Sequence, residues 1–238
     1  MLNATVICHF YNEEYLLQWW LPHHKEIFKH GIMIDYASTD RSVELIKQFC
    51  PDWEIVQSDN KEFDAPMVDA EVMVIESRVK GFKIALNVTE FFMPTDKTDV
   101  LLDTDKLKCY AIPMATMVDN QPEFEPNPLF SLVKQKRFGF WGYSGIKGDE
   151  RFLHNHHNGN YHVGRHGLNI ADIIKTHDAH IYWYGFSPYN SQFIKRKMQI
   201  RERIPQSNVE KNQGFQHQWI EEQMNEKRIE FLSKSGYL

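Results

Sequence analysis

Residues 5–14 read TVICHFYNEE and residues 32–40 read IMIDYASTD, and these two stretches decide the fold class. Each begins as a short run of mainly apolar residues and ends in polar residues that favour turns. Short apolar runs are typical of buried strands in parallel sheets, which are covered on both faces. Because helical patterns separate the runs, the sequence predicts an α/β fold with a mostly parallel central sheet flanked by helices.

The alternation of strand and helix patterns continues through the first half of the chain. Asn12 is expected to cap the first helix and Gly31 to end it, since these residue types favour those positions. Four strands joined by three crossovers would form half of a doubly wound sheet. The expected strands cover 5–10, 32–36, 53–57 and 82–86, and the expected helices cover 13–29, 41–49 and 67–79.

The composition excludes several classes of protein. With 238 residues, 42% of them hydrophobic and 25% charged, the chain is long and apolar enough for one folded domain. A formal net charge of -5 argues against a general nucleic-acid binder, which needs a basic surface. No run approaches the roughly 20 apolar residues of a membrane span. The widely spaced Cys8, Cys50 and Cys109 are expected to stay reduced, which indicates a cytoplasmic protein.

Polar residues follow each expected strand. In open α/β sheets, ligands bind outside the carboxyl ends of the strands, where loops and helix N-termini present backbone donors. The segments at these positions are 9–14, 35–40, 57–60 and 87–91. We therefore expect a binding site at one edge of the sheet.

Two of these segments carry recognisable motifs. Residues 11–14 follow the first strand as Y-N-E-E, and residues 35–40 follow the second strand as D-x-x-S-T-D. In both motifs the sequence resembles the GT-A glycosyltransferases, and specifically their family-2-like branch, over roughly residues 1–95. Residues 87–91, Asn-Val-Thr-Glu-Phe, stand where that family has D-x-D-E-F.

The resemblance implies a GT-A, Rossmann-like fold and a glycosyltransferase. Such an enzyme moves a sugar from a nucleotide-sugar donor, here expected to be a UDP-sugar, to the hydroxyl of a glycan or other acceptor. A single domain over 1–238 is implied, with about 1–112 binding the nucleotide-sugar, about 113–205 binding the acceptor and about 206–238 forming a C-terminal helical cap. No organic cofactor is expected.

The residues expected to contact the nucleotide-sugar lie in the motif segments and in one later turn. Carboxylates such as Asp35 and Asp40 can accept hydrogen bonds from a nucleoside. The alternative for Ser38 and Asp40 is a purely structural helix cap. The expected contacts are His9, Tyr11, Asn12, Glu13, Asp35, Ser38, Asp40, Asn87, Thr89, Arg165 and His166.

The departure from D-x-D bears on metal binding. In the family the paired aspartates hold a divalent cation that neutralises the diphosphate leaving group, and hard cations need charged oxygen ligands. Asn87 and Thr89 are neutral, so Mn²⁺ or Mg²⁺ is expected to bind only weakly. The candidate metal ligands are Glu90 and a late histidine, His180 or His177.

Cationic side chains are then needed to offset the charge of the departing diphosphate. Arg165 and His166, in the turn at 164–167, are expected to supply part of this charge. A basic segment at 195–203 is a further candidate as a lid, although a basic helix is usually a solvated face.

A catalytic base is expected if the reaction inverts the anomeric configuration. A carboxylate must then take the proton of the acceptor hydroxyl as its oxygen attacks the anomeric carbon. Asp149, in a glycine-rich turn, and Asp178, beside several histidines, are the candidates, with Asp172 behind them.

Three other functions fit parts of the sequence. A nucleotidyltransferase would share the nucleotide-binding half, but it typically has a glycine-rich phosphate loop near its N-terminus, and the sequence shows none. A non-catalytic nucleotide-sugar or glycan binder is compatible with the lost aspartates. A metallohydrolase could use the seven histidines between residues 154 and 180, although no acidic partner stands at a known ligand spacing.

Overall fold

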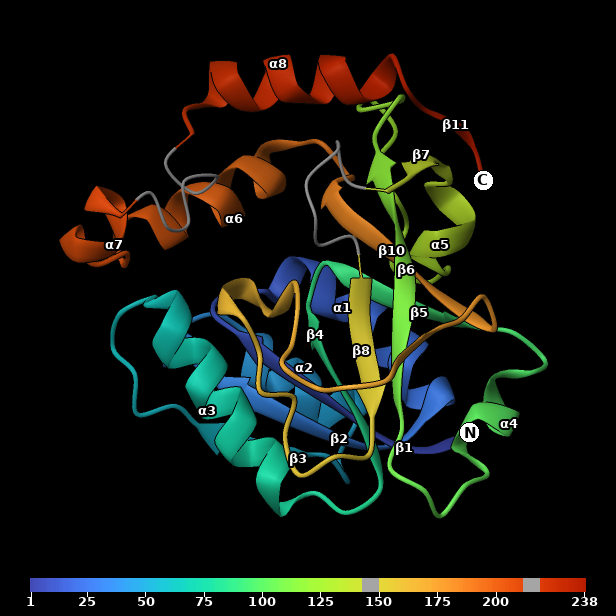
Figure 1. Ribbon diagram of the computed structural model, residues 1–238. Coiled ribbons are helices and arrows are strands. Elements are labelled where there is room, and N and C mark those ends of the chain that lie inside the picture. The colour runs from blue at the N-terminus through green and yellow to red at the C-terminus, as the bar shows by residue number, and fades with distance from the viewer. Residues whose placement is uncertain (143–149, 212–218) are drawn as a thin grey trace.

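The computed structural model describes residues 1–142, 150–211 and 219–238. Four parallel strands form the core of the central sheet (Figure 1), and they run in the order β4-β1-β2-β3. The predicted mostly parallel α/β sheet flanked by helices is confirmed. The strands are β1 (Leu2–Phe10), β2 (Phe28–Asp35), β3 (Glu54–Gln57) and β4 (Phe82–Asn87), and the connecting helices are α1 (Glu14–Ile27), α2 (Ser42–Phe49) and α3 (Ala65–Arg78).

The two faces of this sheet are covered by different helices (Figure 1). Successive side chains of a strand point to opposite faces. Along β1, Val6 and Cys8 belong to the core cluster that contains the buried residues of α1 and α2. Ile7 belongs instead to a second cluster, with Val72 and Ile75 of α3. Burial on both faces explains why the strands read as continuous apolar runs.

The second half of the chain extends the sheet with strands of mixed direction. β6 (Cys109–Val118) pairs antiparallel with β8 (Glu150–His154), which itself pairs antiparallel with β4. The later part of β6 pairs parallel with β10 (Ala179–Phe186), and β10 pairs antiparallel with β5 (Glu90–Pro94). The other elements are β7 (Phe138–Trp141), β9 (Ile173–Lys175), β11 (Gly236–Tyr237), α4 (Thr98–Leu102), α5 (Leu132–Gln135), the 3-10 helix η1 (Val163–Arg165), α6 (Ser191–Arg201), α7 (Gln206–Glu210) and α8 (Glu221–Leu232).

The start and the end of α1 differ from the prediction. Asn12 does not cap the helix, since it has a left-handed backbone with a φ of 49° and the N-cap residue is Glu13. Gly31 does not end the helix, because α1 already ends at Ile27 and Gly31 lies inside β2. The ring of Trp53 packs over Gly31, where an added Cβ would lie 2.1 Å from Trp53 Cδ2. Close packing, and not a helix end, requires this glycine.

The C-terminal helix α8 packs on the second half of the chain (Figure 1). Met224 and Phe231 of α8 share a buried cluster with Val118 and Phe186. The C-terminal helical cap was predicted over about 206–238, and residues 212–218 of this range lie outside the described part of the chain. Among the described helices, none combines the length and the apolar composition that crossing a bilayer requires.

The three cysteines are free, as predicted, and all of them are buried. Burial raises the pKa of the Cys50 and Cys109 thiols to about 12, and it raises the pKa of the Cys8 thiol as well. Thiols with raised pKa values are unreactive at neutral pH, so these three residues act as small apolar side chains of the core.

Candidate functional site

The carboxyl ends of the parallel strands meet at one edge of the sheet. In the strand register, Phe10 lies opposite Asp35, and Asp35 lies opposite Gln57. His9 lies opposite Asn87 on the other side of β1. The register therefore brings the polar segments that follow all four strands side by side, at the edge where the sequence predicted a site.

Residues 11–14 and 35–40, here called the motif turns, are hydrogen-bonded to each other. The backbone N of Asn12 donates to Ser38 Oγ (3.0 Å). In return, Asn12 Oδ1 accepts from the backbone N of Thr39 (2.7 Å) and of Asp40 (3.3 Å). Each motif turn thus holds the other in place, and the two motifs form one structural unit.

Asp40 also joins the motif turns to two helices. Its Oδ2 accepts from the backbone N of Glu14 (2.9 Å) at the start of α1, and its Oδ1 accepts from the backbone N of Ser42 (2.9 Å) at the start of α2. The first N–H groups of a helix have no partner within the helix, and carboxylates satisfy them well. Both carboxylate oxygens of Asp40 and the hydroxyl oxygen of Ser38 accept hydrogen bonds from backbone N–H groups in or next to the motif turns. Ser38 and Asp40 thus have structural roles, and their nucleoside contacts stay predictions, because each of these oxygens keeps a second lone pair.

Asp35 keeps an acceptor for a ligand. Its Oδ1 accepts from the backbone N of Ser38 (2.9 Å), and its carbonyl oxygen accepts from the backbone N of Ser58 (2.9 Å). Within the described residues no donor reaches its Oδ2, and this oxygen is not among the buried atoms without a partner. The side chain is thus fixed by one oxygen and has the other available at the end of β2.

Helix α6 lies across the motif turns. Arg196 forms an ion pair with Glu13, in which Nη2 donates to Oε1 (3.0 Å). Gln199 Nε2 donates to the carbonyl oxygens of Tyr11 (3.2 Å) and of the next residue (3.1 Å). These contacts place the predicted lid segment, 195–203, over the carboxyl ends of β1 and β2.

Arg203, just after α6, covers the ring of Tyr11. Its guanidinium lies 4.0 Å from the centroid of that ring, a distance at which the cation and the π system attract each other. Its Nη1 donates to the carbonyl oxygen of Tyr36 (2.9 Å), and its Nη2 donates to that of Lys61 (2.8 Å). A nucleobase that stacked on this face of the Tyr11 ring would have to displace Arg203.

The carboxyl end of β4 is built from ion pairs. Glu90 is 1% exposed and accepts from Arg151, with Nη2 lying 2.6 Å from Oε1 and Nε lying 3.0 Å from Oε2. Asn87 adds two more donors to the same carboxylate, from its backbone N (2.9 Å) and from its Nδ2 (3.0 Å). Both oxygens of Glu90 are consequently occupied.

A second buried ion pair lies beside the first. Arg165 Nη1 donates to Asp69 Oδ1 (2.7 Å), and Arg165 Nη2 donates to Asn87 Oδ1 (2.7 Å). Asn87 therefore links the two pairs. We call Asp69, Glu90, Arg151 and Arg165 the arginine cluster.

Arg165, which the sequence predicted to contact the donor, is buried in the structure. It is 2% exposed, has a left-handed backbone with a φ of 56°, and contacts Asn87 at the end of β4. His166 is exposed, and its Nδ1 lies 3.2 Å from Arg151 Nη1. Thr89 accepts a hydrogen bond at its carbonyl oxygen from the backbone N of Tyr184 (2.6 Å). The charge of Arg165 thus lies close to the carboxyl ends of the strands, although its side chain is not exposed to solvent.

The arginine cluster changes the titration of its neighbours. Burial acts to raise the pKa of Glu90, but Arg151, the backbone of Asn87 and Arg165 lower this pKa overall. Burial, followed by the charges of Arg165 and Arg151, lowers the pKa of His9 well below its usual value. Glu90 is therefore ionised and His9 is neutral near pH 7.

Two of the predicted metal ligands do not converge. Glu90 lies opposite Trp183 on β10, whereas His180 lies opposite Met93, three residues farther along β5. Three residues of a strand cover about 10 Å, and an odd separation puts the side chains on opposite faces of the sheet. Glu90 also has no free oxygen. The described residues contain no group of three or more His, Cys, Asp or Glu that could hold a metal ion.

The structure places two of the three candidate bases, Asp178 and Asp172, away from the site. The carbonyl oxygen of Asp178 accepts a hydrogen bond from Thr95 Oγ1 (2.8 Å). Asp178 therefore lies beside the C-terminal end of β5, whereas Glu90 begins that strand. Asp172 precedes β9, which pairs with the start of β6, so it lies at the opposite edge of the sheet from Asn87. The predictions that Asp178 or Asp172 is the base are therefore corrected, because neither residue is near the carboxyl ends of the parallel strands. Asp149 lies outside the described residues.

Two residues of the arginine cluster were missed by sequence reasoning. Arg151 stands in β8, whose sequence is ERFLH, and Asp69 stands on the buried side of α3. Charged residues are almost never fully buried unless they are paired. Arg151 directly follows Glu150 and only Phe152 and Leu153 of β8 are apolar, so the local sequence gave no signal that Arg151 is buried.

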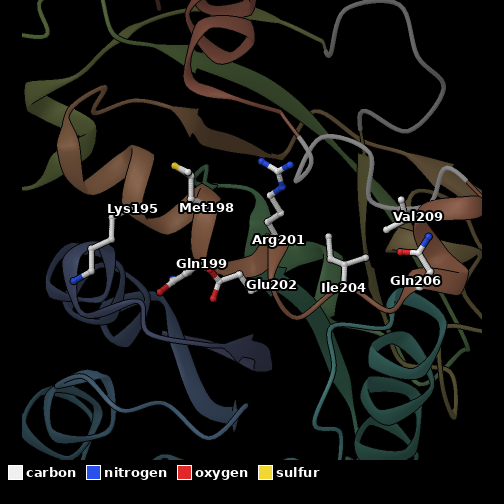
Figure 2. Close-up of a pocket in the computed structure, with 8 residues that line it drawn as sticks. All are labelled: Lys195, Met198, Gln199, Arg201, Glu202, Ile204, Gln206 and Val209. Atoms are coloured by element: carbon white, nitrogen blue, oxygen red, sulfur yellow. The ribbon is translucent and has the colours of Figure 1, made fainter.

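A separate hollow of about 700 Å³ lies along α6 and α7 (Figure 2). This volume is in the range of small-molecule sites. It adjoins the motif turns through Gln199, which also binds the carbonyl oxygen of Tyr11. Figure 2 shows that Lys195 and Arg201 point in different directions, so the two cations do not converge on one anion. The lining residues are Lys195, Met198, Gln199, Arg201, Glu202, Ile204, Gln206 and Val209.

Comparisons with known proteins show the fold. No protein-family model and no curated protein matches the chain. The chain is similar to the solved structure of S. aureus TarS 1-349, with a TM-score of 0.50 and 14% identity over 85% of this chain and 65% of that one. A structure of S. aureus TarS gives a TM-score of 0.49 and 15% identity over 84% of this chain and 39% of that chain.

A more distant likeness involves glucosyl-3-phosphoglycerate synthase from Mycobacterium tuberculosis in complex with Mg²⁺ and uridine-diphosphate. The TM-score is 0.39 and the identity is 10%, over 64% of this chain and 56% of that chain. The present chain spans about 65% of the length of TarS 1-349. The likeness to TarS confirms the predicted GT-A fold, and at this identity it establishes the fold alone.

Proposed function

We propose that the chain is a glycosyltransferase that moves a sugar from a nucleotide-sugar donor, a UDP-sugar, to an acceptor hydroxyl. The observation that carries the proposal is the union of the two motif turns at the carboxyl ends of β1 and β2, beside the available Oδ2 of Asp35. Ligands of open α/β sheets bind at this kind of edge. The fold, which resembles that of TarS, is compatible with the proposal.

The strand ends suggest how the donor lies. A carboxylate oxygen such as Asp35 Oδ2 can accept from a uracil imide or a ribose hydroxyl. The diphosphate would extend from β2 across β1 toward β4, where His9 and Asn87 lie opposite each other. The charge that develops on the departing diphosphate would then be next to the arginine cluster, and preorganised charge of this kind stabilises a transition state.

The acceptor and the base would come from the second half of the chain, about 113–205. Asp149 is retained as the proposed base. Glu150, the next residue in the chain, begins β8, and β8 runs antiparallel to β4. The start of β8 is therefore at the edge where β4 ends, which is the edge where the sugar would lie.

A thermal-shift screen over nucleotides and nucleotide-sugars tests the proposal. A ligand that binds the native state raises the apparent stability. UDP and a UDP-sugar are expected to raise the melting temperature, and ADP serves as the control. If no uridine nucleotide changes the melting temperature, the proposal is wrong.

A variant locates the nucleoside. Asp35→Asn should weaken UDP binding by about 1.5–3 kcal/mol, because a hydrogen bond to a charged acceptor is lost. Asp52→Asn, on an exposed turn before β3, is the matched control and should bind UDP as the wild type does. Equal affinities for both variants in titration calorimetry would remove Asp35 from the site.

A non-catalytic nucleotide-sugar binder is the second candidate. One observation favours it: the carboxylates of Glu13, Asp69 and Glu90 all form ion pairs, so none of these three is a free base. Release of UDP from the UDP-sugar, measured with and without candidate acceptors, separates the two functions. Binding without any release under all conditions would favour the binder.

A further inference from the structure

The carboxyl end of β4 is the position at which the D-x-D motif would stand, and its groups can be tested for fit to a divalent cation. A cation such as Mn²⁺ or Mg²⁺ takes oxygen ligands, of which charged carboxylates bind most strongly. The oxygens that this segment offers are those of Asn87, Thr89 and Glu90. The hydrogen bonds of Asn87 and Glu90 decide whether the segment fits, because the neutral hydroxyl of Thr89 alone is a weak ligand for such a cation.

Asn87 is already engaged through its side-chain amide. Its Oδ1 accepts from Arg165 Nη2 at 2.7 Å, and its Nδ2 donates to Glu90 Oε1 at 3.0 Å. A divalent cation on the same Oδ1 would lie a few ångströms from the guanidinium, and two like charges at that distance repel each other. The amide oxygen is thus held by a cation that belongs to the chain itself.

Glu90 is engaged as completely as Asn87. Its side chain is 1% exposed, and its oxygens accept from Arg151 Nη2 (2.6 Å), Arg151 Nε (3.0 Å) and the backbone N of Asn87 (2.9 Å). A metal ion could use this carboxylate only by breaking a buried, bidentate ion pair. The groups present at the end of β4 therefore do not fit a divalent cation.

The charges of the segment are consistent with this conclusion. Relative to D-x-D, Asn87 and Thr89 remove two negative charges, which equals the positive charge of one divalent cation. In the arginine cluster, two guanidinium groups face two carboxylates. The edge can therefore keep the same overall charge without a metal.

We infer that the diphosphate of the donor binds at the end of β4 without a divalent cation. It is contacted there by the N–H group of His9, whose ring is oriented by Arg165. This inference rests on the proposed function. Arg165 acts as a positioning residue, since it is 2% exposed and reaches the edge through its neighbours.

His9 is suited to the contact for a geometric reason. Arg165 Nη2 lies 3.5 Å from His9 Nδ1, and a guanidinium can only donate, so His9 Nδ1 is the acceptor. The proton of the neutral ring is then on Nε2, which leaves an N–H donor for a phosphate oxygen. His9 ends β1 opposite Asn87, at the position that the diphosphate would cross.

The test is calorimetric titration of UDP into the wild-type protein, once in EDTA and once in millimolar Mn²⁺, together with electron paramagnetic resonance of Mn²⁺ added alone and with UDP. We expect the same dissociation constant within twofold in both buffers, and no Mn²⁺ bound by the protein. Binding of UDP that requires Mn²⁺, or one Mn²⁺ bound per chain, would overturn the inference and leave the proposed function standing. A protein that binds no UDP in either buffer would overturn the proposed function, and the inference with it.

Variants locate the contact. His9→Phe keeps an aromatic ring but removes the donor, and it should weaken UDP binding at least tenfold while uridine binding changes less than twofold. His30→Gln, on the exposed part of β2, is the control. An equal loss of UDP and uridine affinity in His9→Phe would mean that His9 supports the nucleoside or the fold and not the diphosphate.

Discussion

The motif turns and the arginine cluster lie at the same edge of the sheet, but they are held together by different interactions. In the motif turns, the side chains of Asn12, Ser38 and Asp40 accept hydrogen bonds from backbone N–H groups. In the arginine cluster, side chains bind side chains, and Arg151 reaches a carboxylate 61 positions away in the sequence. The first arrangement fixes the shape of the backbone, and the second fixes the charge at the end of β4.

The difference has an energetic consequence. Losing one acceptor in a motif turn frees an N–H group that lies near water, whereas losing one member of the arginine cluster leaves a charge buried without its partner. Uncompensated buried charges are among the most destabilising changes known in proteins. We therefore expect the cluster to be more sensitive to substitution than the motif turns.

The largest effect is expected for Arg151→Met. Glu90 would remain buried without its guanidinium, so the free energy of unfolding should fall by about 3–5 kcal/mol in urea denaturation. Adding Glu90→Gln to the same chain should recover part of this loss, because the unpaired charge is then removed. Arg41→Met is the control, since Arg41 forms an exposed pair with Glu44 and should cause no measurable loss.

A fall of less than 1 kcal/mol for Arg151→Met, at an unchanged denaturant slope, would contradict the buried ion pair. A double variant that is no more stable than the single variant would show that the loss comes from packing and not from the unpaired carboxylate.

A smaller effect is expected in the motif turns. Asp40→Ala removes the acceptor for the first turns of α1 and α2, so the free energy of unfolding should fall by about 1–2 kcal/mol. Thr39→Ala is the matched control, because Thr39 contributes its backbone N and its side chain is exposed. Equal stability of the two variants would show that the carboxylate of Asp40 does not hold the helices.

The smallest effect appears in the pH dependence of stability. The pKa of His9 is lowered in the folded protein, so between pH 7 and pH 6 the unfolded chain takes up a proton at this residue and the folded chain does not. Stability contributed by neutral His9 is thus present above its ordinary pKa and is lost as the pH falls below it. The loss between pH 7 and pH 6 is about 0.7 kcal/mol.

His9→Gln should reduce the fall in unfolding free energy between pH 7 and pH 6 by this amount. His24, whose pKa is also lowered by burial, is unaffected by the substitution and keeps its own share of the pH dependence. A variant with the full wild-type pH dependence would show that His9 titrates normally and lies outside the influence of the arginine cluster.

The first half of the fold was predictable because its signals are local. The apolar runs are strands, and each of the first three is followed by a helix. The positions of the carboxyl ends of β1, β2 and β4 then follow from the order of the parallel sheet. The predicted meeting of His9, Asp35 and Asn87 at one edge needed nothing more than this order.

The rest of the site depends on contacts between distant parts of the chain. Asp178 and His180 looked promising from the clustered histidines, but the pairing of β10 with β5 carries them away from Glu90. Whether Asp40 binds a nucleoside or caps a helix depends on hydrogen bonds that its residue type does not distinguish. Arg165 was predicted as a cation for the donor, but its burial depends on its ion pair with Asp69 on α3, far away in the sequence.

The most direct test of the account is a crystal structure of the protein with UDP, grown in EDTA. We predict uridine beside Asp35, with Arg203 moved from the ring of Tyr11, and the diphosphate next to His9 with no metal ion. UDP bound in the hollow along α6 and α7, against Lys195 or Arg201 and away from Asp35, would contradict the account.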